Sequence, residues 1–447
     1  MKNFSKPISI EKIVNGGFGL GRLDDGRVVL VGKVLPDEKV AITITEERNR
    51  YLYADAAAII EANPARIEPP CSWYGQCGGC DLQHCDYGQQ LRIKTGIVLD
   101  LFLRQFPYAS NGLSALVRDT LPSPAQFGYR QRIRLQVDAD GSAGFLGFRS
   151  HTIIPVRRCR VAKDELNTVL AELSLNSSCL KILKNCKEFE LLFNPISSGV
   201  VCLFHLSRKP RPADIRQAVE LTDTIPLLER VFFQGVDFPL TGPFSSKNDQ
   251  QLNTLQMQLP PYKEEDTPCM LAWEVGGFCQ VNLGQNERLI SHVLDICRLR
   301  REDSILDLFC GMGNFSIPLA AMSATLLGIE GQGSAIRSAR KNSASTGLAN
   351  TTFEKGPIHE TCRRLAGQGR VFDCVVLDPP RQGVPGLARE LAALTARNLL
   401  YISCDPATLC RDLSALARCG LTIRHIQLID MFPQTHHIET VVLLEKN

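Results

Sequence analysis

The stretch Ser304-Ile-Leu-Asp-Leu-Phe309, with the loop Cys310-Gly-Met-Gly313 after it, decides the fold class of this 447-residue chain. It predicts a buried strand that ends in a tight glycine loop, and residues 314–320 have the apolar spacing of a following helix. Thr325–Glu330 predicts the next strand, and residues 334–346 predict the next helix. Strands that alternate with helices are typical of a doubly wound α/β domain with a mostly parallel, Rossmann-like sheet.

The same alternation continues to the end of the chain. Val371–Leu377 predicts a strand that leads into Asp378-Pro-Pro-Arg381, and residues 398–403 predict the strand before Cys404. Residues 423–429 and 438–444 predict the strands that close the sheet.

The glycine loop and the acid that ends the second strand indicate a nucleoside-binding crevice. Glycines let the backbone approach a ligand, and Glu330 is placed to accept ribose hydroxyls. A dinucleotide and S-adenosylmethionine are the competing ligands. An acid beside the loop, Asp307, would repel a diphosphate and tolerate a cationic sulfonium. Asp378-Pro-Pro-Arg381 at a strand end also fits methyl transfer to a base.

Cys404 lies between a predicted strand and a predicted helix. Asp405 suits the N-cap and Pro406 the first helical position. A thiol at the positive end of a helix dipole is expected to favour the nucleophilic thiolate. The alternative is a small buried cysteine that ends a core strand.

Residues 1–65 predict a small closed β-barrel with short strands at 9–13, 27–31, 39–44 and 53–59. Glycine turns are expected at Asn15–Gly21 and around Gly26. Basic and aromatic residues form either an RNA-binding face or charged, solvated strand edges. These residues are Arg22, Arg27, Lys33, Lys39, Arg48, Arg50 and Tyr51.

Three cysteines, Cys71, Cys77 and Cys80, lie within ten positions among glycines. This density is typical of ligands to a metal or an iron–sulfur cluster, and the spacing does not decide between zinc and iron–sulfur. A fourth ligand is required. His84 and Cys85 are the local candidates, and Cys159 is a distant one.

The middle of the chain predicts a helix at 90–104 and a strand at 127–137. Alternation in this strand would place Arg130, Arg132 and Arg134 on one face, as a solvated surface or a track for RNA. Residues 248–268 are polar and contain proline, which predicts a linker.

Composition sets broad limits. A net charge of +3 permits a nucleic-acid partner without requiring one. Seventeen cysteines without a recognisable export signal indicate a reducing cytoplasm, and no apolar run is long enough to span a bilayer.

Six separated motifs, in order, resemble the S-adenosylmethionine-dependent RNA uracil-5-methyltransferases, in the form with an N-terminal TRAM barrel and a [4Fe–4S] cluster. The resemblance covers nearly the full length and is closest to the 23S ribosomal RNA enzymes. The motifs are the cysteine set, Gly276–Asn282, Asp307–Asn314, Asp378–Gly383, Ser403–Thr408 and Phe432–Glu439.

The resemblance implies Cys404 as the nucleophile and Glu439 as the general base. It implies four cluster ligands and five residues at the methyl-donor site. The ligands are Cys71, Cys77, Cys80 and Cys159, and the donor-site residues are Gln280, Phe309, Asn314, Glu330 and Asp378. One departure is Glu354-Lys-Gly-Pro357, where the family often has an Asn or Asp that contacts the donor.

The resemblance also implies three domains: a TRAM barrel at 1–65, a central α+β domain with the cluster at 66–89 and 120–268, and a methyltransferase domain at 90–119 and 269–447. We expect a cytoplasmic monomer whose partner is RNA, 23S ribosomal RNA or, with the same chemistry, transfer RNA. Two further alternatives are an amino-methyltransferase that acts on a purine and an RNA-binding redox sensor with a vestigial methyltransferase fold.

Overall fold

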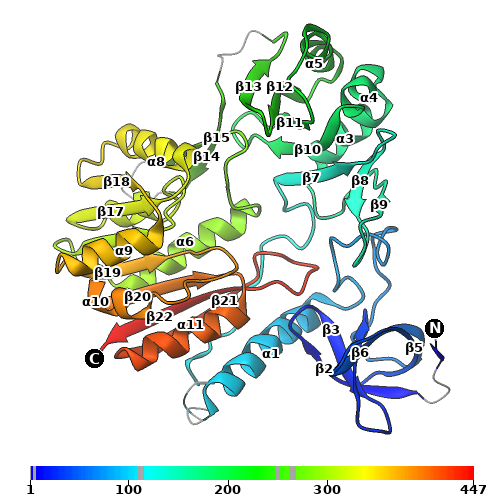
Figure 1. The fold of residues 1–447 in the computed structure, drawn as a ribbon, viewed down its shortest axis with the longest axis horizontal. Coiled ribbons are helices and arrows are strands. Elements are labelled where there is room, and N and C mark those ends of the chain that lie inside the picture. Colours follow the sequence, from blue (N-terminus) through cyan, green and yellow to red (C-terminus); the bar gives the residue numbers. More distant parts are fainter. Residues whose placement is uncertain (1, 4–6, 108–111, 113–114, 248–251, 261–267) are drawn as a thin grey trace.

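The structure is a computed structural model that describes residues 2–3, 7–107, 112, 115–247, 252–260 and 268–447. Within these residues the chain forms a barrel, a central α+β unit and a doubly wound α/β unit (Figure 1). None of the helices described is long and apolar enough to cross a lipid bilayer.

The predicted doubly wound sheet is present. Its strands lie in the order β18-β17-β16-β19-β20-β22-β21, and all neighbours are parallel except that β22 is antiparallel to both β20 and β21. In that order the strands are Thr351–Lys355, Thr325–Glu330, Ser304–Leu308, Phe372–Leu377, Thr395–Ser403, Glu439–Lys446 and Leu421–Ile429.

Helices cover both faces of this sheet. One core contains α6 (Leu283–Cys297), α7 (Ser316–Ala320) and α8 (Gly333–Ser345). The other contains α1, α9, α10 and α11, which span Tyr87–Gln105, Ile358–Gly367, Ala388–Leu394 and Pro406–Arg418.

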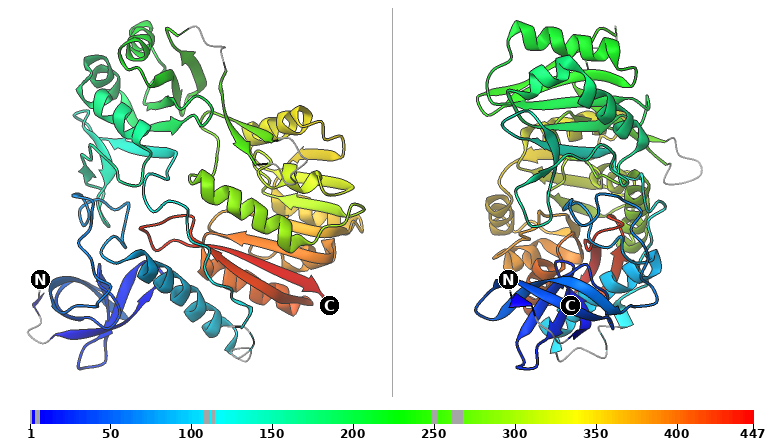
Figure 2. Two further views of the ribbon diagram at one scale, coloured as in Figure 1. Left: turned by 180° about the vertical axis from the view of Figure 1, so that it is seen from behind. Right: turned by 90° about the vertical axis from the view of Figure 1, so that its right-hand side faces the viewer.

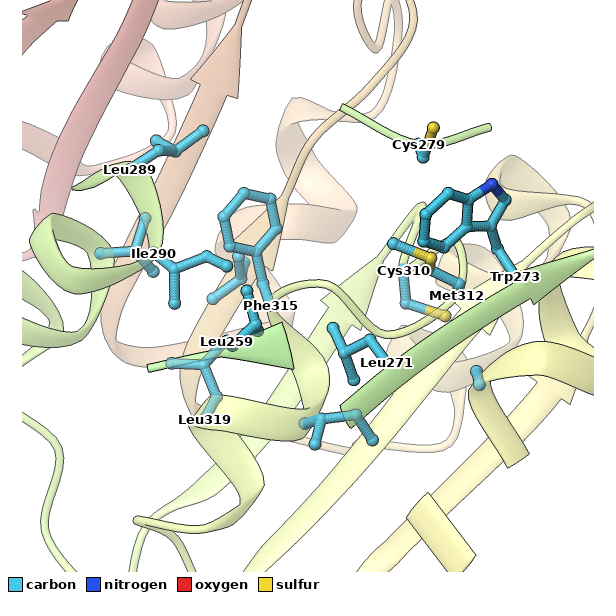
Figure 3. Packing of buried hydrophobic residues seen from close by; sticks show 14 of the residues in the cluster. Leu259, Leu271, Trp273, Cys279, Leu289, Ile290, Cys310, Met312, Phe315 and Leu319 are labelled. Carbon is cyan, nitrogen blue, oxygen red and sulfur yellow. The ribbon is translucent and has the colours of Figure 1, made fainter. Parts of the chain in front are cut away.

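A two-stranded hairpin, β14 (Thr254–Leu259) and β15 (Cys269–Glu274), packs on the first core. In Figure 3, Leu271 and Trp273 lie close to Cys310 and Met312 of the glycine loop. Because β14 falls inside 248–268, the prediction of a continuous linker is wrong there. The rest of that prediction, at 248–251 and 261–267, lies outside the described residues.

The central sheet has the order β13-β12-β11-β10-β7-β8-β9, and α3 (Asp164–Leu175), α4 (Ser177–Leu183) and α5 (Pro212–Thr224) pack on one of its faces. Its strands are Phe238–Phe244, Leu228–Gly235, Val200–Leu206, Cys186–Phe193, Arg132–Val137, Ala143–Leu146 and Ile153–Ile154.

The N-terminal barrel has the order β1-β5-β2-β3-β4-β6 and closes through pairing of β5 with β6. The predicted glycine turn at 15–21 is partly wrong, because Phe18–Arg22 is strand β3. A Cβ atom at Gly19 would lie 2.3 Å from Val34 Cγ2, so this glycine permits close strand packing. The other strands are Lys2–Asn3, Ile8–Val14, Val28–Gly32, Lys39–Glu47 and Tyr51–Glu61.

Helix α1 links the units. It packs against α11 of the doubly wound unit and against β2 of the barrel, and it contains the predicted helix 90–104. The loop between β21 and β22, residues 430–438, projects from the sheet toward the other two units (Figures 1 and 2). Residues 108–111 and 113–114, within the expected 90–119 segment, lie outside the described residues.

Candidate active site

Cys404 immediately follows β20 and precedes α11. The Asp405 carboxylate accepts a hydrogen bond from the Thr408 N–H at 2.9 Å, and Pro406 begins the helix. The predicted strand, cap and helix start are therefore confirmed, and they place the Cys404 thiol at the helix N-terminus.

The expectation of a favoured thiolate is not met in the free protein. Burial first, and then the neighbouring Glu439 and Asp378 carboxyls, raise the pKa of Cys404 to about 12. The nearby Arg381 guanidinium acts in the opposite direction. Burial and these two carboxyls thus favour the protonated thiol, and the carboxyls are the acidic groups nearest to it.

Strand register explains why Glu439 lies near Cys404. Ser403 pairs with Thr440 across the antiparallel β20–β22 ladder, so the next residue of β20 meets the preceding residue of β22. Glu439 is only 4% exposed. Burial and Asp378 raise the pKa of Glu439 well above its ordinary value, and burial raises the pKa of Asp378 to about 7. Both carboxyls are therefore harder to ionise than they would be in water.

The predicted nucleoside crevice lies at the carboxyl ends of β16 and β17. The Glu330 carboxylate accepts hydrogen bonds from the N–H groups of Gly311, at 3.3 Å, and Gln332, at 2.7 Å. A Cβ atom at Gly311 would meet nothing within 4 Å, so the loop leaves open space beside Glu330. This space is suited to a ligand that approaches the backbone.

Negative charge accumulates in the crevice. Burial, and then Asp378 and Glu330, raise the pKa of Asp307 to about 7, while a hydrogen bond from Ser316 opposes them. Carboxyls that raise one another's pKa values do so because their ionised forms repel one another, and a bound cation would reduce this repulsion. A sulfonium fits this donor set and a diphosphate does not.

Two of the remaining donor-site candidates, Phe309 and Asn314, flank the same loop. Phe309 has φ of +62°, a conformation rare for a bulky side chain, and it follows β16 directly. Asn314 exchanges two amide hydrogen bonds with Asn286 of α6, at 2.9 and 3.0 Å. Gln280 is buried, and its main-chain carbonyl accepts a hydrogen bond from the Gln131 side-chain amide at 2.6 Å.

The segment that departs from the family pattern also lies beside the crevice. The Gly356 N–H donates to the carbonyl oxygen of Glu330 at 3.0 Å, and Glu354 pairs with Arg364 at 2.9 Å. This segment therefore supports Glu330 through its backbone.

The four predicted cysteine ligands come from two loops that converge. Cys71, Cys77 and Cys159 act on one another electrostatically, as do Cys80 and Cys159. The N–H of Gly79 donates to Cys77 Sγ at 3.4 Å. Arg130 acts on Cys80 and Cys159, and its buried Nε has no hydrogen-bond partner among the described residues. This set of thiols beside a buried guanidinium fits a thiolate-bound group.

The two local alternatives are engaged elsewhere. The Cys85 thiol is buried and donates to the carbonyl of Leu82 at 3.4 Å. His84 contacts the Tyr74 hydroxyl at 2.6 Å and the Val34 carbonyl at 3.3 Å. Neither takes part in the cysteine set.

The predicted arginine face is wrong in its details. Arg130 precedes β7 and points to the cysteines, while Arg132 and Arg134 each pair with the buried Glu190 at 2.5 Å. Two of the three arginines therefore neutralise a buried acid instead of forming a free track for RNA.

Glu188, Glu190 and His205 are the one group of three or more potential ligands that lies within 4.8 Å in the part of the chain that the structure describes. The two arginine ion pairs on Glu190, and the Gln136 amide on Glu188 at 2.8 Å, already satisfy these carboxylates. The group is consequently a salt-bridge network and not a cation site.

Sequence reasoning missed the partners that hold the site together. Arg381 was quoted only as part of a motif, although it lies near Cys404. Asn286, which orients Asn314, and Lys94, which pairs with Asp430, carried no motif at all. A lysine on the apolar face of the predicted helix 90–104 was the available signal for the last of these.

Comparisons with known proteins agree with this geometry. Residues 265–447 match the family model described as tRNA (uracil-5-)-methyltransferase, and residues 5–57 match the TRAM domain. The barrel thus corresponds to the predicted TRAM module, and the match at 265–447 includes both Cys404 and Glu439.

Two curated relatives match almost the whole chain. Each is named 23S rRNA (uracil(1939)-C(5))-methyltransferase RlmD. The protein of Shewanella sediminis is 31% identical over 99% of this chain and 97% of its own. The protein of Klebsiella pneumoniae is 31% identical over 96% of this chain and 93% of its own.

A solved structure has the same fold. It is the tRNA (uracil-54, C5)-methyltransferase of Pyrococcus abyssi in complex with S-adenosyl-L-homocysteine, with a TM-score of 0.70 and 22% identity over 98% of this chain and 100% of that one.

Proposed function

The chain belongs to the family of S-adenosylmethionine-dependent RNA uracil-C5-methyltransferases, and from this we propose that it forms 5-methyluridine in 23S ribosomal RNA. The observation that carries the proposal is the β20–β22 register, which sets a thiol and a carboxyl opposite each other beside an acidic crevice. The choice of 23S ribosomal RNA is supported by the two full-length relatives with that substrate in their names.

In the proposed reaction, Cys404 supplies the nucleophile. Carbon-5 of uracil is too electron-poor to react with a methyl sulfonium unaided. Addition of the thiolate to carbon-6 moves an electron pair toward carbon-5 and the adjacent carbonyl, which makes carbon-5 nucleophilic. Because the pKa of Cys404 is raised in the free protein, Arg381 is the neighbouring cation that would favour loss of the thiol proton.

Glu439 completes the cycle as the general base. After methylation, carbon-5 carries both a hydrogen and a methyl group. The ionised carboxylate of Glu439 takes that proton, the electron pair re-forms the carbon-5–carbon-6 double bond, and the bond from carbon-6 to Cys404 breaks to release the thiolate. A carboxyl with a raised pKa is suited to proton transfer near neutrality.

The methyl donor would occupy the crevice beside the glycine loop. S-adenosylmethionine supplies the methyl group when bound. Glu330 would accept the ribose hydroxyls, and Asp307 and Asp378 would favour the positive charge. The five donor-site residues are Gln280, Phe309, Asn314, Glu330 and Asp378.

A [4Fe–4S] cluster on Cys71, Cys77, Cys80 and Cys159 is part of the proposal. Tetrahedral zinc would bring its four sulfurs to about 3.8 Å from one another. Among the described residues, no three of these sulfurs lie within 4.8 Å of each other. The wider spacing supports a group larger than a single zinc ion, and these four thiols would hold it as thiolate ligands.

The TRAM barrel at 1–65, the central domain at 66–89 and 120–268, and the methyltransferase domain at 90–119 and 269–447 would together bind the RNA. The target uridine must leave its stack to reach Cys404. We place the chain in the reducing cytoplasm as a monomer, where its cysteines would not be oxidised to disulfides.

Transfer RNA is the second candidate substrate, because the family model that matches residues 265–447 bears its name. The amino-methyltransferase alternative needs no covalent adduct, and Cys404→Ala would leave it active. The vestigial redox sensor would not bind S-adenosylmethionine. Family membership supports neither of these two.

The test is incubation with the methyl donor and 23S ribosomal RNA or transfer RNA that contains 5-fluorouridine. Fluorine cannot leave as a proton, so a covalent complex through Cys404 accumulates, and mapping the nucleotide in it identifies the target. Cys404→Ala forms no complex. A complex on transfer RNA alone would overturn the ribosomal assignment, and turnover by Cys404→Ala would overturn the mechanism.

A further inference from the structure

Three parts of the chain that are distant in sequence meet at the loop between β21 and β22. The N–H groups of Asp81 and Leu82, beside the cysteine-rich loop, donate to the carbonyl of Gln434 at 3.1 and 3.0 Å. The same two segments also share a side-chain contact, a hydrogen bond between His436 Nδ1 and the Asp81 carboxylate. The cysteine-rich loop therefore holds the segment that leads directly into Glu439.

The barrel covers the same contact. Gly17, in the turn between β2 and β3, has φ of +79°, and a Cβ atom there would lie 3.2 Å from both Asp81 Oδ2 and His436 Nδ1. The Tyr74 hydroxyl donates a hydrogen bond to the main-chain carbonyl of Asp81 at 2.7 Å and so helps to hold this residue in place. The Asp81–His436 pair is thus enclosed by the barrel and the cysteine-rich loop.

The pair continues toward the reacting groups. The rings of His436 and His437 lie 4.2 Å apart between centroids. Burial, His436 and Arg381 lower the pKa of His437 to about 3, which places Arg381 close to this ring. Arg381 in turn acts on Cys404. A displacement of His436 would therefore be felt at the wall of the catalytic pocket.

Other contacts hold the first half of the loop. Lys94 pairs with Asp430 and donates to the Phe432 carbonyl at 3.0 Å, and Gln90 donates to the Gln434 side chain at 3.0 Å. Beyond Gln434, the side-chain hydrogen bond that joins the described part of the loop to another unit is that of His436 with Asp81. The second half, next to Glu439, depends on it.

We propose that Asp81 and His436 form a latch that positions the end of the 430–438 loop, and with it Glu439, for removal of the carbon-5 proton. Asp81 is a positioning residue, since it acts through His436. The inference rests on the proposed function, because it assigns the latch to the elimination step of that reaction.

The two halves of the reaction distinguish a latch from residues that only stabilise the fold. Addition of Cys404 and methylation of carbon-5 do not use Glu439, whereas elimination does. If Glu439 is misplaced, the covalent adduct between Cys404 and an ordinary uridine therefore persists for longer. Loss of global structure would reduce adduct formation and elimination together.

The experiment compares Asp81→Ala and His436→Ala with the unaltered enzyme, carrying its cluster, on ribosomal RNA fragments containing uridine or 5-fluorouridine. We expect both variants to form the 5-fluorouridine complex at rates within about twofold of the unaltered enzyme. Turnover on uridine falls about tenfold, and the covalent complex accumulates there, because small misplacements of a catalytic group are costly. Asp81→Asn, which still accepts the hydrogen bond from His436, restores turnover.

Lys12→Ala is the matched control. It removes the Lys12–Asp100 contact between the barrel and α1, away from the loop, and leaves the ratio of the two rates unchanged. Visible absorbance measures the cluster content of each variant. If Asp81→Ala loses the cluster, the comparison is made with His436→Ala alone. Unchanged turnover, or parallel loss of trapping and turnover in His436→Ala, would overturn the latch. Failure of the unaltered enzyme to form the 5-fluorouridine complex would instead overturn the proposed function.

Discussion

Lys94 of α1 and Asp430 at the end of β21 form an ion pair whose two side chains are both 0% exposed. The Tyr87 hydroxyl donates to the second Asp430 oxygen at 2.8 Å, and the Phe432 carbonyl accepts from Lys94. Both members of the pair therefore make a further hydrogen bond, which a buried ion pair needs to offset its desolvation. It ties α1, which lies before the central sheet in sequence, to the loop that leads to Glu439.

Replacing Lys94 with Met leaves Asp430 buried without its partner. We expect a loss of about 3–5 kcal/mol in the free energy of unfolding, which is typical when one member of a buried pair is removed. Thermal denaturation measures it. Lys12→Ala breaks the partly exposed pair with Asp100 and should cost about 1 kcal/mol or less. Equal effects of the two changes would contradict the structural role of the buried pair.

The environment of Cys404 makes a prediction about its reactivity. Burial and the carboxyls of Glu439 and Asp378 raise its pKa to about 12. In the free enzyme, the rate of iodoacetamide alkylation at Cys404 should rise about tenfold per pH unit up to pH 10 without a plateau, because the thiolate is the reactive form. Peptide mass spectrometry isolates this thiol from the others.

Asp378→Asn is the control for this titration. It removes one of the carboxyls that raise the pKa of Cys404, so alkylation should be faster between about pH 8 and pH 10, where Asp378 is ionised in the unaltered enzyme. A plateau near pH 8 in the unaltered enzyme would mean that the dipole of α11 outweighs the carboxyls.

Glu190 should contribute to stability above pH 4.5 and lose that contribution as the pH falls. Burial opposes its ionised form, but His205, Arg132 and Arg134 outweigh burial and lower its pKa to about 2. A depressed folded-state pKa stabilises the fold above the unfolded value, near 4.5, and the effect disappears as the pH approaches 2. We expect Glu190→Gln to lose about 3 kcal/mol at pH 7.

Chemical denaturation measures the free energy of unfolding of both proteins. The difference in this free energy between Glu190→Gln and the unaltered protein should become smaller as the pH falls from 5 to 3. Glu445→Gln, at the exposed pair with Arg424, should show a small difference at every pH. A difference of constant size for Glu190→Gln would show that its carboxylate is not selectively stabilised.

Local periodicity was enough to predict the doubly wound sheet. Strands such as Thr325–Glu330 are short apolar runs, and the Asp405 cap is a local signal. Strand β3 was missed because its glycines suggest a turn, while in the barrel Gly19 and Gly21 make room for side chains and backbone of β2 and the segment after β4. That requirement comes from closure of the barrel, which no local window contains.

The details of the site depended on distant partners. Arg130 leaves the predicted face because its backbone bridges to Ala162 and Asn282. The raised pKa of Cys404 depends on the strand that begins 35 positions later, at Glu439. Motifs therefore predicted Cys404 and Glu439 as a pair, but the pKa shift of Cys404 comes from its burial and from neighbours that the strand order brings close.

The acidic crevice should favour a cationic methyl donor over its neutral product in a pH-dependent way. Asp307 and Asp378 have pKa values raised to about 7, so they gain negative charge between pH 6 and 8. Charge on these carboxyls attracts the sulfonium of S-adenosylmethionine and has little effect on uncharged S-adenosylhomocysteine. The ratio of the two affinities, measured by calorimetry, should therefore rise severalfold from pH 6 to pH 8. Asp378→Asn should flatten this rise, and a ratio independent of pH in the unaltered enzyme would contradict the assignment of these carboxyls to the donor site.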